Sequence, residues 1–276
     1  MCRRKKHVMT GVVKGVPNLF CGKFDVGGNY NLTCNNYMRR IFMADNFIEQ
    51  LVENVGKIPT AKVNRTEYLR SCFGINYSDK MEDILKYGPV EGGVPVKEVK
   101  AIARKAIYNE SAITIGTSFL TGLPGGAAMI ATIPTDITQY YLHLIRIAQK
   151  LLFLYGWEKN VYNQIGDMDP EGKTMLYLSL GVMSGVGFAA SAMAKVIGKG
   201  LGKAAQKALV CGVIKTCFTK SVARTIVKNI GVKQTARGLF KIVPGIGGVF
   251  SAGVTAITFV PSTYKLETMF RKHTVK

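Results

Sequence analysis

The sequence lacks the residue patterns on which common catalytic and metal sites are built. Its 276 residues include six cysteines and three histidines, with no C-x-x-C pair and no H-E-x-x-H pair. The spacing of His7, Cys21 and Cys34 matches no standard zinc finger, and no Ser or Cys stands in a nucleophile motif. We therefore expect no metal site, no cofactor and no catalytic residue. We also expect reduced thiols in the cytosol, because no apolar signal-peptide core follows the basic cluster at 3–6.

Acidic residues are scarce. The chain has 17 Asp and Glu against 37 Lys and Arg, a formal net charge of +20, and no acid lies between Glu171 and Glu267. Within that interval basic residues recur at every fourth position, which places them on one face of a helix. The residues of these Lys/Arg stripes that we predict to bind lipid are Lys195, Lys199, Lys203, Lys207, Lys220, Arg224 and Lys228.

A surface of one charge sign favours an anionic partner. We expect this partner to be anionic membrane lipid, because long apolar runs share the same region of the chain. Nucleic acid is the weaker alternative, since aromatic residues are not interleaved with the basic ones and no helix-turn-helix pattern is present. A basic surface with no single target is a third interpretation.

Alternating strand patterns are absent after residue 95. Helical periodicity instead predicts an all-α fold, a multi-helix bundle with Gly-rich apolar helical hairpins and a poorly patterned N-terminal region. The predicted domains are 1–95, a loop-rich start followed by short helices, and 96–276, a helical domain.

Glycine, proline and capping residues set the expected helix boundaries. The pattern predicts helices over about 38–58, 66–73, 79–87, 96–121, 135–155, 170–199, 203–230 and 233–242, and a last one that follows the run 244–248 and ends in the basic tail 271–273. Asp79 and Glu82 have the spacing of a capping box. Pro134 and Pro261 are each expected to start a helix after a Gly-rich hairpin, and Pro170 to open the helix that it begins.

The helix predicted over 135–155 carries a polar stripe on an otherwise apolar surface. At helical spacing Asp136, Gln139, His143 and Arg146 share one side. An enzyme that uses this stripe is one interpretation, since His143 is the single candidate base away from the termini. A polar stripe in an apolar bundle needs internal hydrogen-bond partners, however, so we interpret it as a structural polar seam.

Long runs almost free of charge are a further feature. The segments 111–138, 174–194 and 242–264 contain one charged residue, Asp136, and each approaches the length of a bilayer span. They are rich in Gly, Ala, Ser and Thr. Such residues suit a tightly packed soluble bundle and also helix packing in lipid, for which Gly181 and Gly185 have the spacing. We expect a protein that docks on membranes.

Two motifs resemble those of the EcsC protein family. The first is an apolar Gly-Leu hairpin at 121–123, then Pro-x-Asp, then a helix that ends in Tyr-Gly. The second is the run 241–247 followed by a Gly- and Ala-rich helix that closes on Tyr264 and Arg271. The resemblance covers about 96–272 and departs from the family at 254–256, where the family often carries Asn. The motif residues that carry it are Pro134, Asp136, Tyr155, Gly156, Pro244 and Gly247.

The resemblance implies an all-helical, membrane-linked bacterial protein with no assigned reaction. The family's namesake accompanies an ABC-type exporter, so the implied partners include a membrane transporter or another membrane protein. The Pro-Asp helix is also similar to that of a helical domain attached to some bacterial GTPases.

These features predict a membrane-associated helical protein that binds anionic lipid surfaces through Lys/Arg stripes and apolar hairpins, without catalysis. The expected location is the cytoplasmic face of the membrane, peripheral or partly inserted. Two alternatives stay open, a membrane-permeabilising effector that inserts its Gly-rich hairpins and a nucleic-acid-binding basic protein.

Overall fold

The computed structural model describes residues 47–123, 126–163, 165–168, 170–198 and 246–274. Every element in these ranges is helical, which confirms the predicted all-α multi-helix bundle. All of the elements belong to the second of the chain's two compact units, which spans 45–276. Residues on both sides of the predicted domain boundary at 95 therefore lie in one unit.

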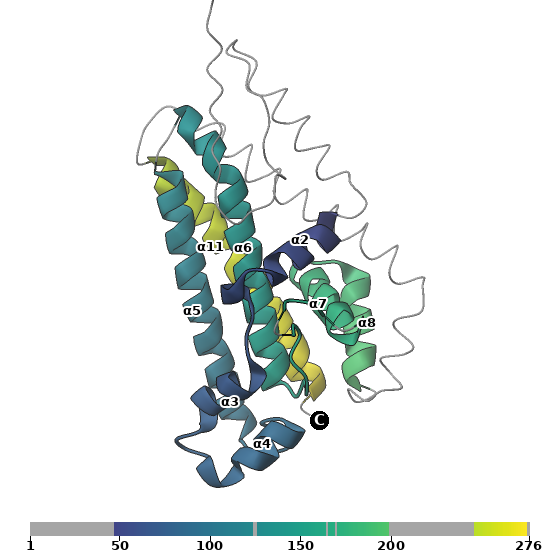
Figure 1. Cartoon of the computed structure of the whole chain (residues 1–276). Coiled ribbons are helices and arrows are strands. Elements are labelled where there is room, and N and C mark those ends of the chain that lie inside the picture. The colour runs from purple at the N-terminus through teal and green to yellow at the C-terminus, as the bar shows by residue number, and fades with distance from the viewer. Residues whose placement is uncertain (1–46, 124–125, 164, 169, 199–245, 275–276) are drawn as a thin grey trace, which may run out of the picture. The chain divides into compact units, whose positions relative to one another are not determined.

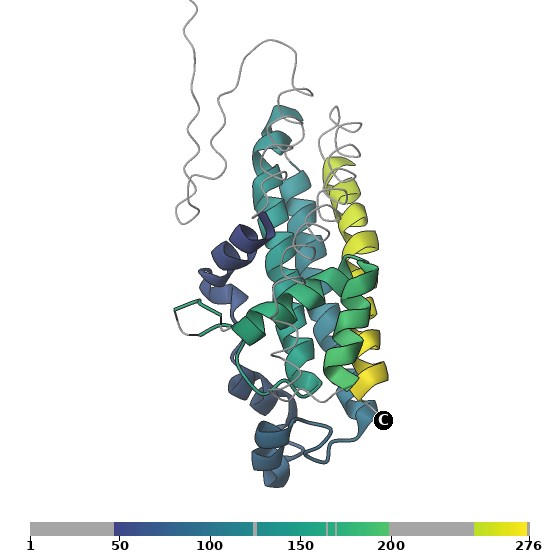
Figure 2. The same cartoon turned by 90° about the vertical axis from the view of Figure 1, so that its right-hand side faces the viewer.

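Three long helices form the centre of this unit. α5 (Val96–Gly122), α6 (Gly126–Leu154) and α11 (Ile246–Thr274) lie side by side, and both α6 and α11 run antiparallel to α5 (Figures 1 and 2). Apolar residues three or four positions apart line the buried face of α6, among them Tyr141, Leu144, Ile145, Ala148, Leu151 and Leu152. Burial of one Leu or Ile side chain contributes roughly 2 kcal/mol, so packing between the helices is the main source of their stability.

α5 and α11 come closest near the C-terminal end of α5. A Cβ atom added to Gly122 would lie 2.6 Å from the carbonyl oxygen of Gly247, and one added to Gly248 would lie 2.9 Å from the carbonyl oxygen of Phe119. Real Cβ atoms essentially never approach another atom so closely. Glycine on both helices therefore permits the two backbones to touch.

α7 (Pro170–Met183) packs against α6 and α11, and α8 (Gly187–Gly198) packs against α7 and α11 (Figure 2). The prediction of a single helix over 170–199 is wrong, because Gly185 has a φ of 79° and ends the first helix. The N–H of Val186 donates to Gly181 at 2.9 Å and that of Gly185 to Val182 at 3.0 Å, which is the Schellman pattern. Gly181 and Gly185 consequently do not share a helix.

The helix starts predicted at two prolines are also wrong. α6 begins at Gly126 and continues through Pro134, and α11 begins at Ile246 and contains Pro261. A proline inside a helix removes one backbone hydrogen bond and costs about 3 kcal/mol. The packing of both long helices against α5 outweighs that cost.

Shorter helices precede the three long ones, and two of them, α2 and α3, pack against α6. Asn64 caps α3 through its side chain, which accepts the N–H of Glu67 at 3.2 Å. The capping box predicted at Asp79 and Glu82 is not formed, because α4 starts at Met81 after a 3-10 turn and has no side-chain cap. The elements are α2 (Phe47–Gly56), η1 (Pro59–Ala61), α3 (Arg65–Phe73), η2 (Ser78–Lys80) and α4 (Met81–Tyr87).

Candidate functional site

The polar stripe of α6 meets one acidic residue of α5. The carboxylate of Glu110 is buried, and three basic side chains of α6 surround it. Its Oε2 lies 2.5 Å from Nδ1 of His143, while its Oε1 lies 2.6 Å from Nζ of Lys150 and 3.0 Å from Nε of Arg146. We call these four residues the Glu110 cluster.

The cluster determines the ionisation of its carboxyl group. Burial alone would raise the pKa of Glu110, because a low-dielectric interior disfavours the charged form. The hydrogen bond from His143 and the positive charges of Lys150 and Arg146 outweigh that effect and lower the pKa to about 2. Glu110 is therefore ionised at neutral pH and links α5 to α6 by charge-assisted hydrogen bonds.

Two side chains of α6, Arg146 and Gln149, form hydrogen bonds with the segment that connects α2 to α3. Arg146 donates from Nη1 to the carbonyl oxygen of Thr60. Gln149 donates to the carbonyl oxygen of Ala61 at 2.8 Å and accepts the N–H of Val63 at 3.2 Å. His143 and Arg146 thus have structural partners in the fold, and neither lines the cavity described below.

Asp136 belongs to a separate group of hydroxyl-bearing residues. Its buried Oδ1 accepts hydrogen bonds from Ser118 at 2.7 Å and from Thr121 at 3.1 Å, both on α5. Thr255 of α11 donates to the Ser118 oxygen at 2.8 Å, which brings all three long helices into one network. Thr255 stands in the segment where the resembled family often has Asn, so its hydroxyl provides a hydrogen-bonding group at that place.

Tyr155 and Gly156, two residues of the family motif, complete the end of α6. The buried Tyr155 hydroxyl donates to Oε1 of Glu267 at 2.9 Å, and Arg271 donates to the same oxygen at 3.1 Å. Burial and the neighbouring Glu267 carboxylate raise the pKa of Tyr155, so it remains a neutral donor. Gly156 has a φ of 96° and ends α6 where the sequence predicts.

The other predicted residues are scattered or lie outside the described part. Gln139 is half-buried, and within the described ranges no hydrogen bond joins it to either polar group. Gly247 packs against Gly122. Lys195 is exposed in the last turn of α8. The residues that lie outside the described ranges are Lys199, Lys203, Lys207, Lys220, Arg224, Lys228 and Pro244.

One end of the group formed by the three long helices, α5, α6 and α11, carries no charged residue. It comprises 111–122 of α5, 126–135 of α6 and 246–264 of α11, and we call it the uncharged end. Several of its large apolar side chains are exposed, including Ile113, Phe119 and Leu120 on α5 and Val249 and Ile257 on α11. Across the helices that the structure describes, none has the length and apolar character needed to cross a bilayer.

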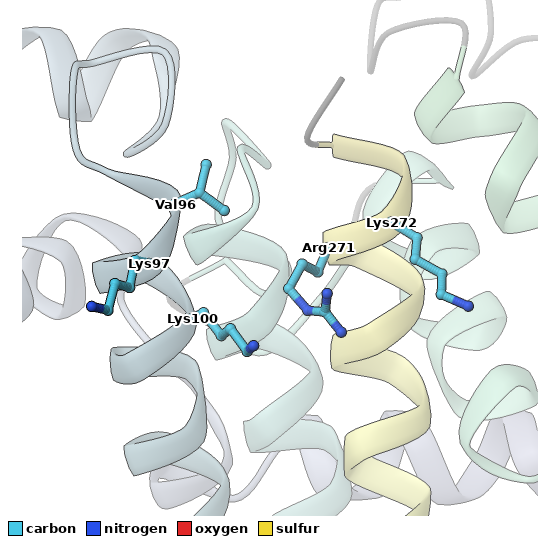
Figure 3. Close-up of a pocket in the computed structure, with 5 residues that line it drawn as sticks. All are labelled: Val96, Lys97, Lys100, Arg271 and Lys272. Carbon is cyan, nitrogen blue, oxygen red and sulfur yellow. The ribbon is translucent and has the colours of Figure 1, made fainter.

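The opposite end of the same group is basic. Where α5 begins and α11 ends, a cavity of about 480 Å³ is lined by Val96, Lys97, Lys100, Arg271 and Lys272 (Figure 3). Lys100 and Arg271 extend toward one another from the two helices, whereas Lys97 and Lys272 point outward on either side. We call this feature the basic cavity.

The sequence analysis missed the acidic partners, Glu110 and Glu267. A signal for Glu110 exists, because it follows Val99, Ala103 and Ala106 on the buried face of α5, where a charged residue needs a partner. Glu267 is the only acid after residue 171. Its isolation in a basic region indicates a specific role.

Within the described ranges, no group of three or more His, Cys, Asp or Glu residues is arranged to hold a metal ion. Comparisons of the chain with family models, with curated proteins and with solved structures gave no match.

Proposed function

We propose that this protein binds anionic membrane surfaces. In this proposal the uncharged end of α5, α6 and α11 enters the membrane from one side, while the Lys/Arg stripes of 195–228 contact the lipid headgroups. No catalytic step is part of the proposal.

The observation that carries the proposal is the exposure of apolar side chains at an end of the bundle that has no charge. Leu120 is 64% exposed and Val249 is 66% exposed, although the backbones of their two helices, α5 and α11, approach each other closely at Gly122 and Gly247. A water-facing helix surface normally carries charged residues, so several exposed apolar side chains at an end without charge favour an interaction site there. Lipid is favoured as the occupant because the chain also carries a net charge of +20.

On α5 and α6 the uncharged end is about as long as one leaflet is thick, whereas on α11 the range 246–264 extends about 28 Å. Residues 111–122 of α5 extend about 18 Å along the helix axis, at a rise of 1.5 Å per residue. Half of the hydrocarbon thickness of a bilayer is about 15 Å. Partial insertion from one side is therefore the arrangement that we propose, in place of a complete crossing.

The resemblance to the EcsC family supports the same proposal. It implies an all-helical, membrane-linked bacterial protein, with a transporter or another membrane protein as a partner. Those features remain part of the proposal together with the lipid contact.

The test is co-sedimentation of the full chain with vesicles of phosphatidylcholine alone and with vesicles that also contain phosphatidylglycerol. We expect binding to the anionic vesicles that weakens as salt is raised but does not vanish, because insertion of apolar surface is insensitive to salt. Equal binding to both kinds of vesicle would contradict the role of charge. Complete loss of binding in high salt would contradict the insertion of the uncharged end.

Dye release from the same vesicles distinguishes the first alternative. A chain that only binds leaves the vesicles sealed, whereas a permeabilising effector would empty them. Binding to duplex DNA that is tighter than binding to anionic vesicles, at the same salt concentration, would favour the nucleic-acid alternative.

A further inference from the structure

Four positive side chains line the basic cavity, and two of them, Lys100 and Arg271, extend toward one another. Lys97 and Lys100 come from the first two turns of α5, and Arg271 and Lys272 come from the last turn of α11 (Figure 3). The fifth lining residue is Val96, so no lining residue supplies negative charge. Lys100 and Arg271, which extend toward one another, repel each other, and an anion between them would remove that repulsion.

Acidic residues of the protein neutralise only a small part of this charge. Arg271 donates from Nε to Glu267 at 3.1 Å, which leaves its two terminal nitrogens for other acceptors. In the described part of the chain, no ion pair involves Lys97, Lys100 or Lys272. Glu98, the acid nearest in sequence, accepts a hydrogen bond from the hydroxyl of Tyr77 at 2.8 Å.

The position of the two α5 lysines is opposite to the usual preference of helices. Cations are favoured near a helix C-terminus, as Arg271 and Lys272 are, and disfavoured near an N-terminus. Lys97 and Lys100 nevertheless occupy positions two and five of α5. The N–H of Glu98 donates to the carbonyl oxygen of Pro95 at 2.9 Å, but Pro95 at the N-cap gives the N–H groups of Val96 and Lys97 no side-chain acceptor. A bound anion would accept hydrogen bonds from these N–H groups and balance the lysines at the same time.

We infer that the basic cavity binds the phosphate group of a phosphorylated compound. Terminal guanidinium nitrogens, lysine amines and the first N–H groups of a helix are the donors with which proteins hold phosphate. The basic cavity opens to solvent and its volume of about 480 Å³ exceeds that of a phosphate ion, so the rest of a phosphorylated molecule has room to extend from it.

The location separates this site from the proposed membrane contact. Lys97 precedes Ser111, where the uncharged end begins, by about 20 Å along α5. The phosphate site thus goes beyond the proposed membrane function and does not rest on it. A water-borne phosphorylated compound and a lipid headgroup share the phosphate chemistry, and the experiment below distinguishes the two sources.

Isothermal titration of the full chain with inorganic pyrophosphate tests the inference. The cavity variant is Lys100→Gln combined with Lys272→Gln, which removes one charge from each of the two helices that line the space. The matched control is Lys105→Gln combined with Lys265→Gln, which removes the same charge from exposed positions of the same helices, outside the cavity.

We expect saturable binding by the natural chain and a dissociation constant raised about tenfold or more in the cavity variant. The dissociation constant of the control should differ from that of the natural chain by less than about twofold, because exposed charges outside the site contribute little to binding.

Absence of saturable pyrophosphate binding would overturn the inference, and so would an equal loss of affinity in the control. The titration is then repeated with vesicles containing phosphatidic acid in excess. Displacement of pyrophosphate supports the site and assigns it to a lipid headgroup, whereas an unchanged dissociation constant supports the site and assigns it to a water-borne compound. Failure of the chain to bind any vesicle would affect the proposed membrane function alone.

Discussion

His143 Nδ1 on α6 lies 2.5 Å from Oε2 of Glu110 on α5, and this contact joins two helices in the interior of the bundle. Lys150 and Arg146 approach the other oxygen of the same carboxylate. One acid of α5 therefore contacts three basic side chains of α6. The stability of the helix pair depends on that acid more than on any one of its partners.

Replacing Glu110 with Gln is expected to destabilise the protein by about 3 kcal/mol, because removing one partner of a buried ion pair leaves the others uncompensated. Glu98→Gln, an exposed position on the same helix, provides the control and should change stability by less than about 1 kcal/mol. Urea denaturation followed by circular dichroism measures both variants. Similar small losses in the two would show that the Glu110 cluster contributes no more than a surface contact.

Lowering the pH should remove the stability that the ionised Glu110 contributes in the natural chain. The pKa of Glu110 is lowered to about 2, from an ordinary value of 4.5, by the hydrogen bond of His143 and the charges of Lys150 and Arg146, which outweigh the effect of burial. A lowered pKa in the folded state gives stability that is complete above the unfolded value and is lost as the pH falls toward the folded value. The difference between the ordinary pKa of 4.5 and the folded-state pKa of about 2 corresponds to about 3 kcal/mol of folding free energy.

The measurement compares the natural chain with Glu110→Gln in urea at a series of pH values. Between pH 7 and 5 the difference in free energy of unfolding should be constant, and between about 4.5 and 2 it should shrink. A difference that stays the same down to pH 2 would contradict the lowered pKa.

Gly122 and Gly116 offer a paired test of the α5–α11 contact. Gly122→Ala places a methyl group 2.6 Å from the carbonyl oxygen of Gly247 and should cost about 1 to 3 kcal/mol, because the two backbones must separate. At Gly116 on the same helix an added Cβ meets nothing within 4 Å, so Gly116→Ala should stabilise by up to about 1 kcal/mol through helix propensity. Thermal unfolding of both variants measures the contrast. Equal shifts of the melting temperature in the same direction would contradict the close approach.

The sequence predicts features that follow from local patterns and misses those that depend on distant contacts. The helix end at Gly156 was correct because glycine's tolerance of positive φ is a local property. The polar stripe was visible because Asp136 and His143 fall at helical spacing. Glu110 could not be assigned as the partner, since 33 residues separate it from His143 and only tertiary packing brings them together.

The incorrect helix boundaries predicted at Pro134, Pro261 and Gly185 also arise from tertiary packing that local sequence patterns do not reveal. Pro134 and Pro261 disfavour helix locally, yet burial of the long helices against α5 outweighs about 3 kcal/mol at each. Gly185 could have continued a helix or ended one, and the positive φ that decides the matter depends on how α7 and α8 pack. The phosphate-binding inference also depends on tertiary structure, because α5 and α11 are far apart in sequence.

Substitution of an apolar residue by lysine at the uncharged end distinguishes membrane insertion from electrostatic attraction to the lipid surface. Leu120 and Val249 lie near the C-terminal end of α5 and the N-terminal end of α11, and both are exposed. Leu120→Lys and Val249→Lys each raise the net charge, so attraction to anionic lipid alone predicts tighter binding. Insertion predicts the reverse, with the partition coefficient on anionic vesicles falling about tenfold or more per substitution, since lysine is costly in hydrocarbon.

Ile75→Lys is the matched control for these two variants. Ile75 is 94% exposed between α3 and η2, outside the uncharged end, and its substitution adds the same charge. Insertion of the uncharged end predicts that Ile75→Lys binds anionic vesicles as well as or slightly better than the natural chain, because its apolar side chain does not enter the membrane. If all three variants bind more tightly, the protein is held by charge alone. If all three bind equally weakly, the effect is a general one of surface change, and the uncharged end has no special role.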